Sequence, residues 1–260
     1  MFKYLLALLL CASPSYSQIL PEKERAEVID EVLAWRFETV LPALMDRTNI
    51  DMWVLISREY NEDPVMRTML PATWLNARRR TILVFFRDKE KDTLERLAVA
   101  RYNIGDNIVS SWDPEAQPDQ WQALLEIITE RSPEKIGLNY SEHFNIADGI
   151  VKTDFEEFME VLPSEYKEKV VSAEELAIGW IETRTAAEME LYEELVAVTH
   201  GIIAEAFSEK VITPGITTSA DVVWWMRQTV TELGLETWFH PTVDIQRNEE
   251  ELKDHIEAFS

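Results

Sequence analysis

Residues 51–57 read DMWVLIS and residues 81–86 read TILVFF, two almost continuous apolar runs of strand length. A strand with one face in water alternates apolar and polar residues, whereas a strand covered on both faces is apolar throughout. Both runs therefore predict buried strands in a sheet that carries other structure on each side. Further extended segments are predicted at 94–102, 135–140 and 169–171.

Helical patterns lie between these strands. Apolar residues at three- and four-residue spacings predict helices over 21–46, 118–131 and 154–161. Strands that alternate with helices from 51 to 171 are typical of an α/β domain with a largely parallel or mixed sheet. The sequence therefore predicts an α/β fold.

The pattern changes near residue 180. Helices are predicted at 172–180, 185–210 and 221–233, and Pro214-Gly215 predicts a turn between the last two. Thr218 or Ser219 is expected to cap the last helix, Gly234 to end it, and residues 237–245 to be extended. We expect one domain over 18–180 and a second, mainly helical region over 181–260.

Three consecutive arginines, Arg78, Arg79 and Arg80, stand directly before the second buried strand. Guanidinium groups match the geometry of carboxylate and phosphate, so this cluster is compatible with an anion site. The charged end of an ordinary strand gives the same pattern. From sequence alone the second interpretation is preferred.

The first 17 residues have the three parts of a secretory signal: Lys3, the apolar run LLALLLCA at 5–12, and Ser15 and Ser17 at a small-x-small cleavage site. The run is shorter than the roughly 20 residues that span a bilayer. We therefore expect cleavage after Ser17, export to the periplasm or the extracellular space, and no membrane association afterwards. Cys11, the only cysteine, lies inside this segment, which excludes disulfides and Cys-ligated zinc from the mature chain.

The chain is strongly acidic, with 48 Asp and Glu against 25 Lys and Arg and a formal net charge of −23. A surface of that sign repels nucleic acids and anionic membranes, so neither is expected as a partner. The charge favours solubility and says little about a substrate.

Sequence motifs of self-contained enzymes are absent: there is no G-x-S-x-G, H-E-x-x-H, P-loop or G-x-G-x-x-G pattern. The histidines are His143, His200, His240 and His255. His240 and Asp244 on a strand would be about 13 Å apart, too far to share one metal ion. Glu251 and His255 could meet on one helical turn, but two ligands fall short of a metal site. His200 is expected to be a core or interface histidine.

Three segments in the second region resemble the pita-bread metallopeptidases, the family of creatinase, prolidase and Xaa-Pro aminopeptidase. Residues 182–189 (ETRTAAEM) resemble the opening of the catalytic domain, 212–218 (ITPGITT) its Pro-Gly-hydrophobic-Thr turn, and 238–243 (WFHPTV) its Phe-x-Pro strand. Upstream, 51–57 and 135–141 resemble parts of a creatinase-type N-terminal domain. The resemblance implies such a domain with a mixed sheet, followed by the first helices and strand of a pita-bread α+β domain.

The resemblance also implies hydrolysis of peptides with proline at the second position by two bridged divalent metals, Mn, Co or Zn. The family's five ligands lie beyond the Phe-x-Pro strand, so no metal ligand is assigned here and this chain is expected to be inactive alone. His255 stands near the family's substrate-side histidine, although Gln246-Arg247-Asn248 replaces the usual Gly-x-Asn. His240 is the other candidate catalytic residue.

Three interpretations remain open. The chain is the front part of such a metallopeptidase, a non-catalytic secreted module that supports binding or a homodimer, or an unrelated secreted α/β protein. The first interpretation, the front part of a longer metallopeptidase, is favoured because the second region lacks the sheet that its helices should cover.

Overall fold

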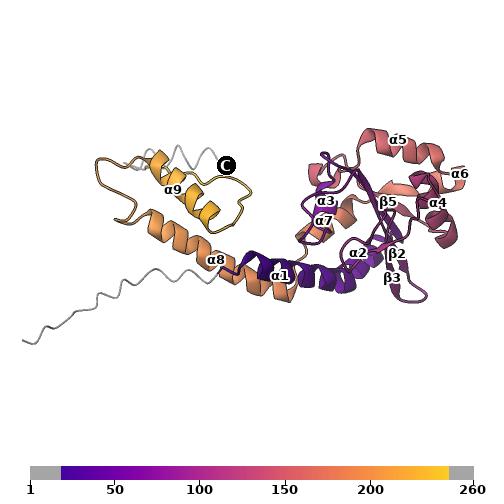
Figure 1. Cartoon of the computed structure of the whole chain (residues 1–260), viewed down its shortest axis with the longest axis horizontal. Coiled ribbons are helices and arrows are strands. Elements are labelled where there is room, and N and C mark those ends of the chain that lie inside the picture. Colours follow the sequence, from indigo (N-terminus) through magenta and orange to yellow (C-terminus); the bar gives the residue numbers. More distant parts are fainter. Residues whose placement is uncertain (1–18, 246–260) are drawn as a thin grey trace, which may run out of the picture. The chain divides into compact units, whose positions relative to one another are not determined.

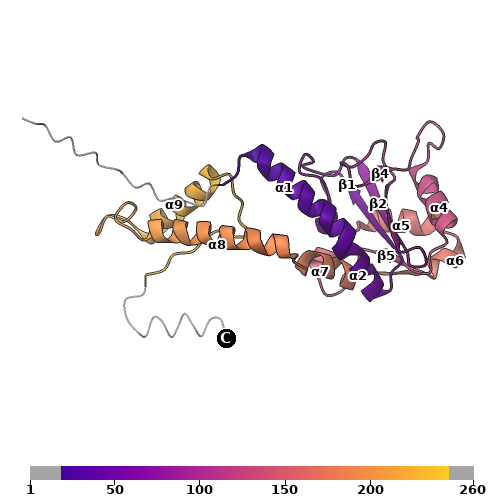
Figure 2. The ribbon, with the colours of Figure 1, turned by 90° about the horizontal axis from the view of Figure 1, so that it is seen from below.

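The computed structural model describes residues 19–245 (Figures 1 and 2). These residues form two compact units that divide between Ala187 and Glu188. The first holds residues 21–187; the second holds 188–245 together with Ile19 and Leu20. His255, Glu251, Cys11 and the proposed signal peptide lie outside the described residues. No helix of the described part is long and apolar enough to cross a membrane.

A six-stranded mixed sheet in the order β4-β3-β2-β1-β5-β6 organises the first unit. The central strand β1 runs antiparallel to β2 and parallel to β5. β2 and β3 are antiparallel, whereas β3–β4 and β5–β6 are parallel. The α/β fold with a mixed sheet, predicted from sequence, is confirmed. The strands are β1 Met52–Arg58, β2 Arg80–Asp88, β3 Thr93–Ala98, β4 Val109–Ser110, β5 Ile136–Leu138 and β6 Val170–Ser172.

Helices cover both faces of the sheet, as the apolar runs of β1 and β2 predict (Figure 2). Side chains alternate along β1: Trp53 and Leu55 join one core cluster, while Val54 joins the cluster on the opposite face. The first cluster packs under α1, α2, α3 and α7, and the second under α4 and α5. The helices are α1 Glu22–Trp35, π-helical η1 Arg36–Val40, α2 Leu41–Thr48, α3 Pro64–Arg67, α4 Gln120–Arg131, 3-10 helix η2 Asn145–Ala147, α5 Lys152–Val161, α6 Ser164–Lys167 and α7 Glu174–Glu182.

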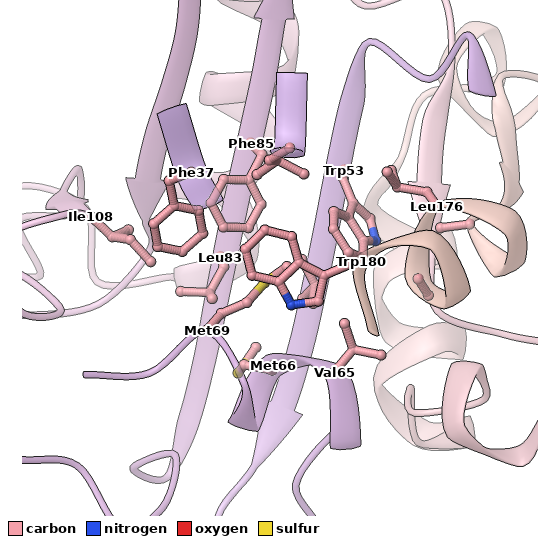
Figure 3. Packing of buried hydrophobic residues seen from close by; sticks show 14 of the residues in the cluster. Phe37, Trp53, Val65, Met66, Met69, Leu83, Phe85, Ile108, Leu176 and Trp180 are labelled. Carbon is pink, nitrogen blue, oxygen red and sulfur yellow. The ribbon is translucent and has the colours of Figure 1, made fainter. Parts of the chain in front are cut away.

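Aromatic rings fill the centre of the first cluster (Figure 3). Phe37 lies with its ring centroid 5.4 Å from Phe85 and 5.5 Å from Trp180. Trp180, fully buried on α7, donates its indole N–H to Thr68 Oγ1 at 2.8 Å. Arg36 covers the same indole at 4.3 Å and donates to the carbonyls of Trp180 and Thr183. These contacts hold α7 against η1.

The second unit contains all but the first two residues of α8 (Ala186–Ala206) and the whole of α9 (Ser219–Glu232). Its core is small and apolar, formed by Val198, Ile202, Ala206, Val222 and Met226. Thr218 and Asp221 form a capping box at the start of α9, and Gly234 adopts a positive φ just after its end, both as predicted.

Residues 237–245 differ from the expected strand. They form neither helix nor strand in the structure, and Trp238 and Phe239 are largely exposed. A strand needs a hydrogen-bonded neighbour, and the described part of this unit contains no strand that could serve as one.

Candidate functional site

A concave site of about 920 Å³ lies at one end of the sheet in the first unit. Antiparallel pairing creates it, because Arg58 at the end of β1 lies opposite Arg80 at the start of β2. The chain leaving β3 reaches the same end, where the Val99 N–H donates to the Ile82 carbonyl at 2.9 Å. The lining residues are Arg58, Glu59, Trp74, Arg78, Arg79, Arg80, Thr81, Ala100, Arg101, Tyr102, Trp112 and Gln120, called here the arginine cleft.

Two of its arginines form ion pairs with acidic residues of α5. Arg58 donates from Nε and Nη2 to the fully buried carboxylate of Asp154 at 2.7–3.0 Å. This hydrogen bonding raises the pKa of Arg58 above its ordinary value. Arg80 donates to Glu157 at 3.0 Å and lies 3.6 Å from Asp154. The charges of Arg58 and Arg80 are therefore largely balanced by α5.

Gln120 at the start of α4 fixes the position of Arg80. Its side-chain oxygen accepts from Arg80 Nε at 2.8 Å, and its amide donates to the carbonyls of Arg80 and Val99. The Arg80 guanidinium also lies 4.1 Å from the Trp121 ring centroid. A buried amide with these three bonds holds the ends of β2 and β3 together at the back of the cleft.

The other three arginines, Arg78, Arg79 and Arg101, are exposed. Within residues 19–245, none of their guanidinium groups forms an ion pair or a hydrogen bond with an acid. Arg78 stacks on Trp74 at 5.2 Å and lies 5.9 Å from the Tyr102 ring. Glu59, the only acid in the lining, accepts from the backbone N–H of Arg79. Positive charge is therefore in excess here, in a chain with a formal net charge of −23.

The candidate His240 lies elsewhere, in the second unit. It is exposed and borders a smaller hollow of about 320 Å³ beside the end of α9, with Arg227, Thr231 and Glu236 in the lining. The other candidate, His255, lies outside the described residues. His200 is exposed on α8 and not in the core, because the buried positions of that helix are Val198, Ile202 and Ala206; the interface role expected as the alternative stays a prediction.

A metal ion would have to be held by nearby donor side chains. In the described part of the chain, no group of three or more His, Cys, Asp or Glu side chains is placed to hold a metal ion. A bridged metal pair of the kind implied by the sequence resemblance needs more donors than that. The residues described therefore do not fit such a pair, and no catalytic step is assigned through one.

A buried carboxylate, Asp63, lies between β1 and α3 and resembles a catalytic group at first sight. Burial raises its pKa, while hydrogen bonds from Met66 N, Asn139 Nδ2 and Val65 N act in the opposite direction. Asn139 in turn accepts from Trp53 Nε1 at 2.8 Å. All these groups are mutually satisfied and none lines the cleft, so the network is structural.

Comparisons with known proteins give a structural likeness but no sequence match. No protein-family model and no curated protein sequence matches this chain. Among solved structures, an Xaa-Pro dipeptidase from Bacillus anthracis is similar with a TM-score of 0.43 and 16% identity. The match covers 78% of this chain and 49% of that chain, so the chain spans about half of that protein's length.

The sequence showed only part of the arginine cleft. The triplet at 78–80 is visible as an arginine run, and an anion site was one of its two interpretations. Arg58 and Arg101 join the triplet only through the register of β1, β2 and β3. Without that register no sequence pattern connects residues that far apart.

Proposed function

We propose that this chain supplies the N-terminal domain and the first helices of the catalytic domain of an exported metallopeptidase of the Xaa-Pro aminopeptidase and prolidase kind. The observation that carries the proposal is the order of three segments. Residues 182–189 lead into α8, 212–218 form the turn before α9, and 238–243 follow α9. This is the order of the segments that open a pita-bread catalytic domain.

In this proposal residues 18–180 form the creatinase-like domain and residues 181–260 begin the catalytic domain. The substrate class is a peptide with proline at its second position. His240 and His255 act on the substrate side, where an imidazole can donate to or accept from a peptide group. Two divalent metals, Mn, Co or Zn, would activate water in the complete enzyme, and their ligands are not assigned to any residue of this chain.

The native protein provides the test. Antibodies raised against residues 21–187 are used to isolate it from its source, and its mass and its hydrolysis of Ala-Pro with added Mn²⁺ are measured. We expect a species larger than the 30.2 kDa of this chain, with metal-dependent hydrolysis. Chelation should abolish the activity, and the isolated 18–260 chain should show none. A native protein of this length without peptidase activity would contradict the proposal.

A second candidate function is a non-catalytic exported binding module. The arginine cleft favours it, because a wide concave site with uncompensated positive charge occurs in the unit that carries neither His240 nor His255. This candidate predicts ligand binding by the chain as it stands, with no peptidase activity in any longer form. The isolation experiment above separates the two candidates.

A further inference from the structure

Unpaired positive charge is unusual in this chain. Acidic residues outnumber basic ones by 48 to 25, so most arginines have acids available to pair with. Arg58, Arg80, Arg87 and Arg131 all do so. Arg78, Arg79 and Arg101 converge on one cleft and have no acidic partner among residues 19–245. Three guanidinium groups in the lining of one cleft are therefore available to an external anion.

The cleft is also organised in advance. Arg80 and Arg58 are held by Asp154 and Glu157, and Gln120 bonds to both strand ends. The segment before β2 is fixed by Thr81, whose Oγ1 accepts from Arg78 N and donates to the Arg78 carbonyl. A ligand that binds here does not have to order the backbone, which lowers the entropic cost of binding.

Aromatic rings form the apolar part of the lining. Trp74 and Tyr102 meet edge to face at 5.8 Å, with Arg78 over both rings. The Trp112 indole is anchored by its N–H to the Gln117 carbonyl at 2.7 Å. Flat rings beside guanidinium planes can pack against a planar group of a ligand, while the guanidinium forks bind its oxygen atoms.

We propose that the arginine cleft binds a small organic anion in which a carboxylate or a phosphate is joined to a planar group. Arg78 and Arg101 contact the oxyanion, and Trp74 and Tyr102 contact the planar part. A polyanion such as a nucleic acid is disfavoured, because the positive charge is confined to the cleft and the chain as a whole carries −23. The site neither uses nor requires the peptidase chemistry proposed above, so the two proposals fail or succeed separately.

The test is calorimetric titration of the full chain at low salt with four probes: phenyl phosphate, benzoate, inorganic phosphate and phenol. We expect phenyl phosphate or benzoate to bind one equivalent, inorganic phosphate to bind more weakly, and phenol not to bind. Whether benzoate or phenyl phosphate binds tighter identifies the oxyanion. Affinity should fall as salt is raised, since the arginines are exposed.

Two variants locate the site. Arg78→Gln/Arg101→Gln should weaken binding at least about tenfold, because each charge-assisted hydrogen bond contributes substantially to affinity. Arg227→Gln is the matched control: this arginine also stacks on a tryptophan, Trp224 at 4.1 Å, but lies in the other unit. Circular dichroism confirms that each variant is folded. The proposal is overturned if neither organic anion binds more tightly than inorganic phosphate, if Arg78→Gln/Arg101→Gln binds like the unaltered chain, or if Arg227→Gln weakens binding as much as that double substitution.

Discussion

Arg58 at the end of β1 donates three hydrogen bonds to the carboxylate of Asp154 on α5. The Asp154 side chain is completely buried, whereas that of Arg58 is 39% exposed. The bond joins two residues that are 96 positions apart in sequence, and it holds Arg58, which lines the arginine cleft. One ion pair thus has both a structural role and a role in positioning the site.

Replacing Asp154 by Asn should destabilise the first unit. It leaves Arg58 and Arg80 without their shared carboxylate, and we expect a loss of roughly 2–3 kcal/mol in the free energy of unfolding. That is less than the 3–5 kcal/mol of a fully buried pair, because water reaches Arg58. Urea unfolding at pH 7 measures this change in the free energy of unfolding. Glu156→Gln is the control: its pair with Lys152 on the same helix is exposed and should contribute less than about 0.5 kcal/mol.

The buried Asp63 should give a measurable pH dependence. Its folded pKa is raised, mainly by burial, above the ordinary value of 3.8, so the folded protein holds the proton more tightly than the unfolded chain. The contribution of Asp63 to stability is therefore greatest at low pH and is lost as pH rises from 3.8 through the folded pKa.

An Asn at this position does not titrate, so unfolding of Asp63→Asn and of the unaltered chain is compared across this pH range. We expect the stability advantage of the unaltered chain to shrink as pH rises. An advantage that is constant or grows with pH would show that the folded pKa is not raised. Other titrating groups are common to both proteins and cancel in the difference.

Trp180 should contribute strongly to the stability of the first unit. Its ring stacks on Phe37, and Arg36 covers it, with almost no exposure to solvent. Trp180→Ala should cost about 3–5 kcal/mol, the range for removing a large buried aromatic side chain. Trp224→Ala, at a 62% exposed tryptophan of the other unit, should change stability by less than about 0.5 kcal/mol. Equal effects of the two substitutions would contradict this assignment of the core.

Export gives a prediction of a different kind. The charged start, the apolar run and the spacing of Ser15 and Ser17 predict a mature N-terminus at Gln18. Mass spectrometry of the N-terminal peptide, on protein from the cell exterior or the periplasm, checks it. Recovery of material that begins at Met1 from that fraction would refute cleavage.

The sequence predicted the buried strands well because their signal is local. β1 and β2 contain long apolar runs, and the burial of most of their residues follows from those runs. The two-residue strand β4 and the four-residue helix α3 were missed, since neither is long enough to show a period. The predicted strand at 237–245 failed for a related reason: an extended pattern does not supply a partner strand.

The candidate site was less predictable. His240 and His255 come from the sequence resemblance and from imidazole chemistry and stay predictions, whereas the arginine cleft forms where Arg58, Arg80 and Arg101 lie together. The proximity of these three arginines depends on strand direction and register, which an apolar run does not encode. The excess of positive charge in the cleft depends on which arginines Asp154 and Glu157 reach, and this too follows only from the packing of α5.

The order of the sheet also bears on self-association. Its outer strands, β4 and β6, have just two and three residues, and β4 pairs with only Leu97 and Ala98 of β3, so Thr93–Arg96 of β3 also lie at that edge. Long open edges are templates on which a further chain can add a strand, and short edges remove that template. Growth of this sheet by strand addition, from a second copy or from an extended peptide, is therefore poorly supported at the β6 edge, and at the other edge Thr93–Arg96 of β3 form the longer stretch without a neighbouring strand.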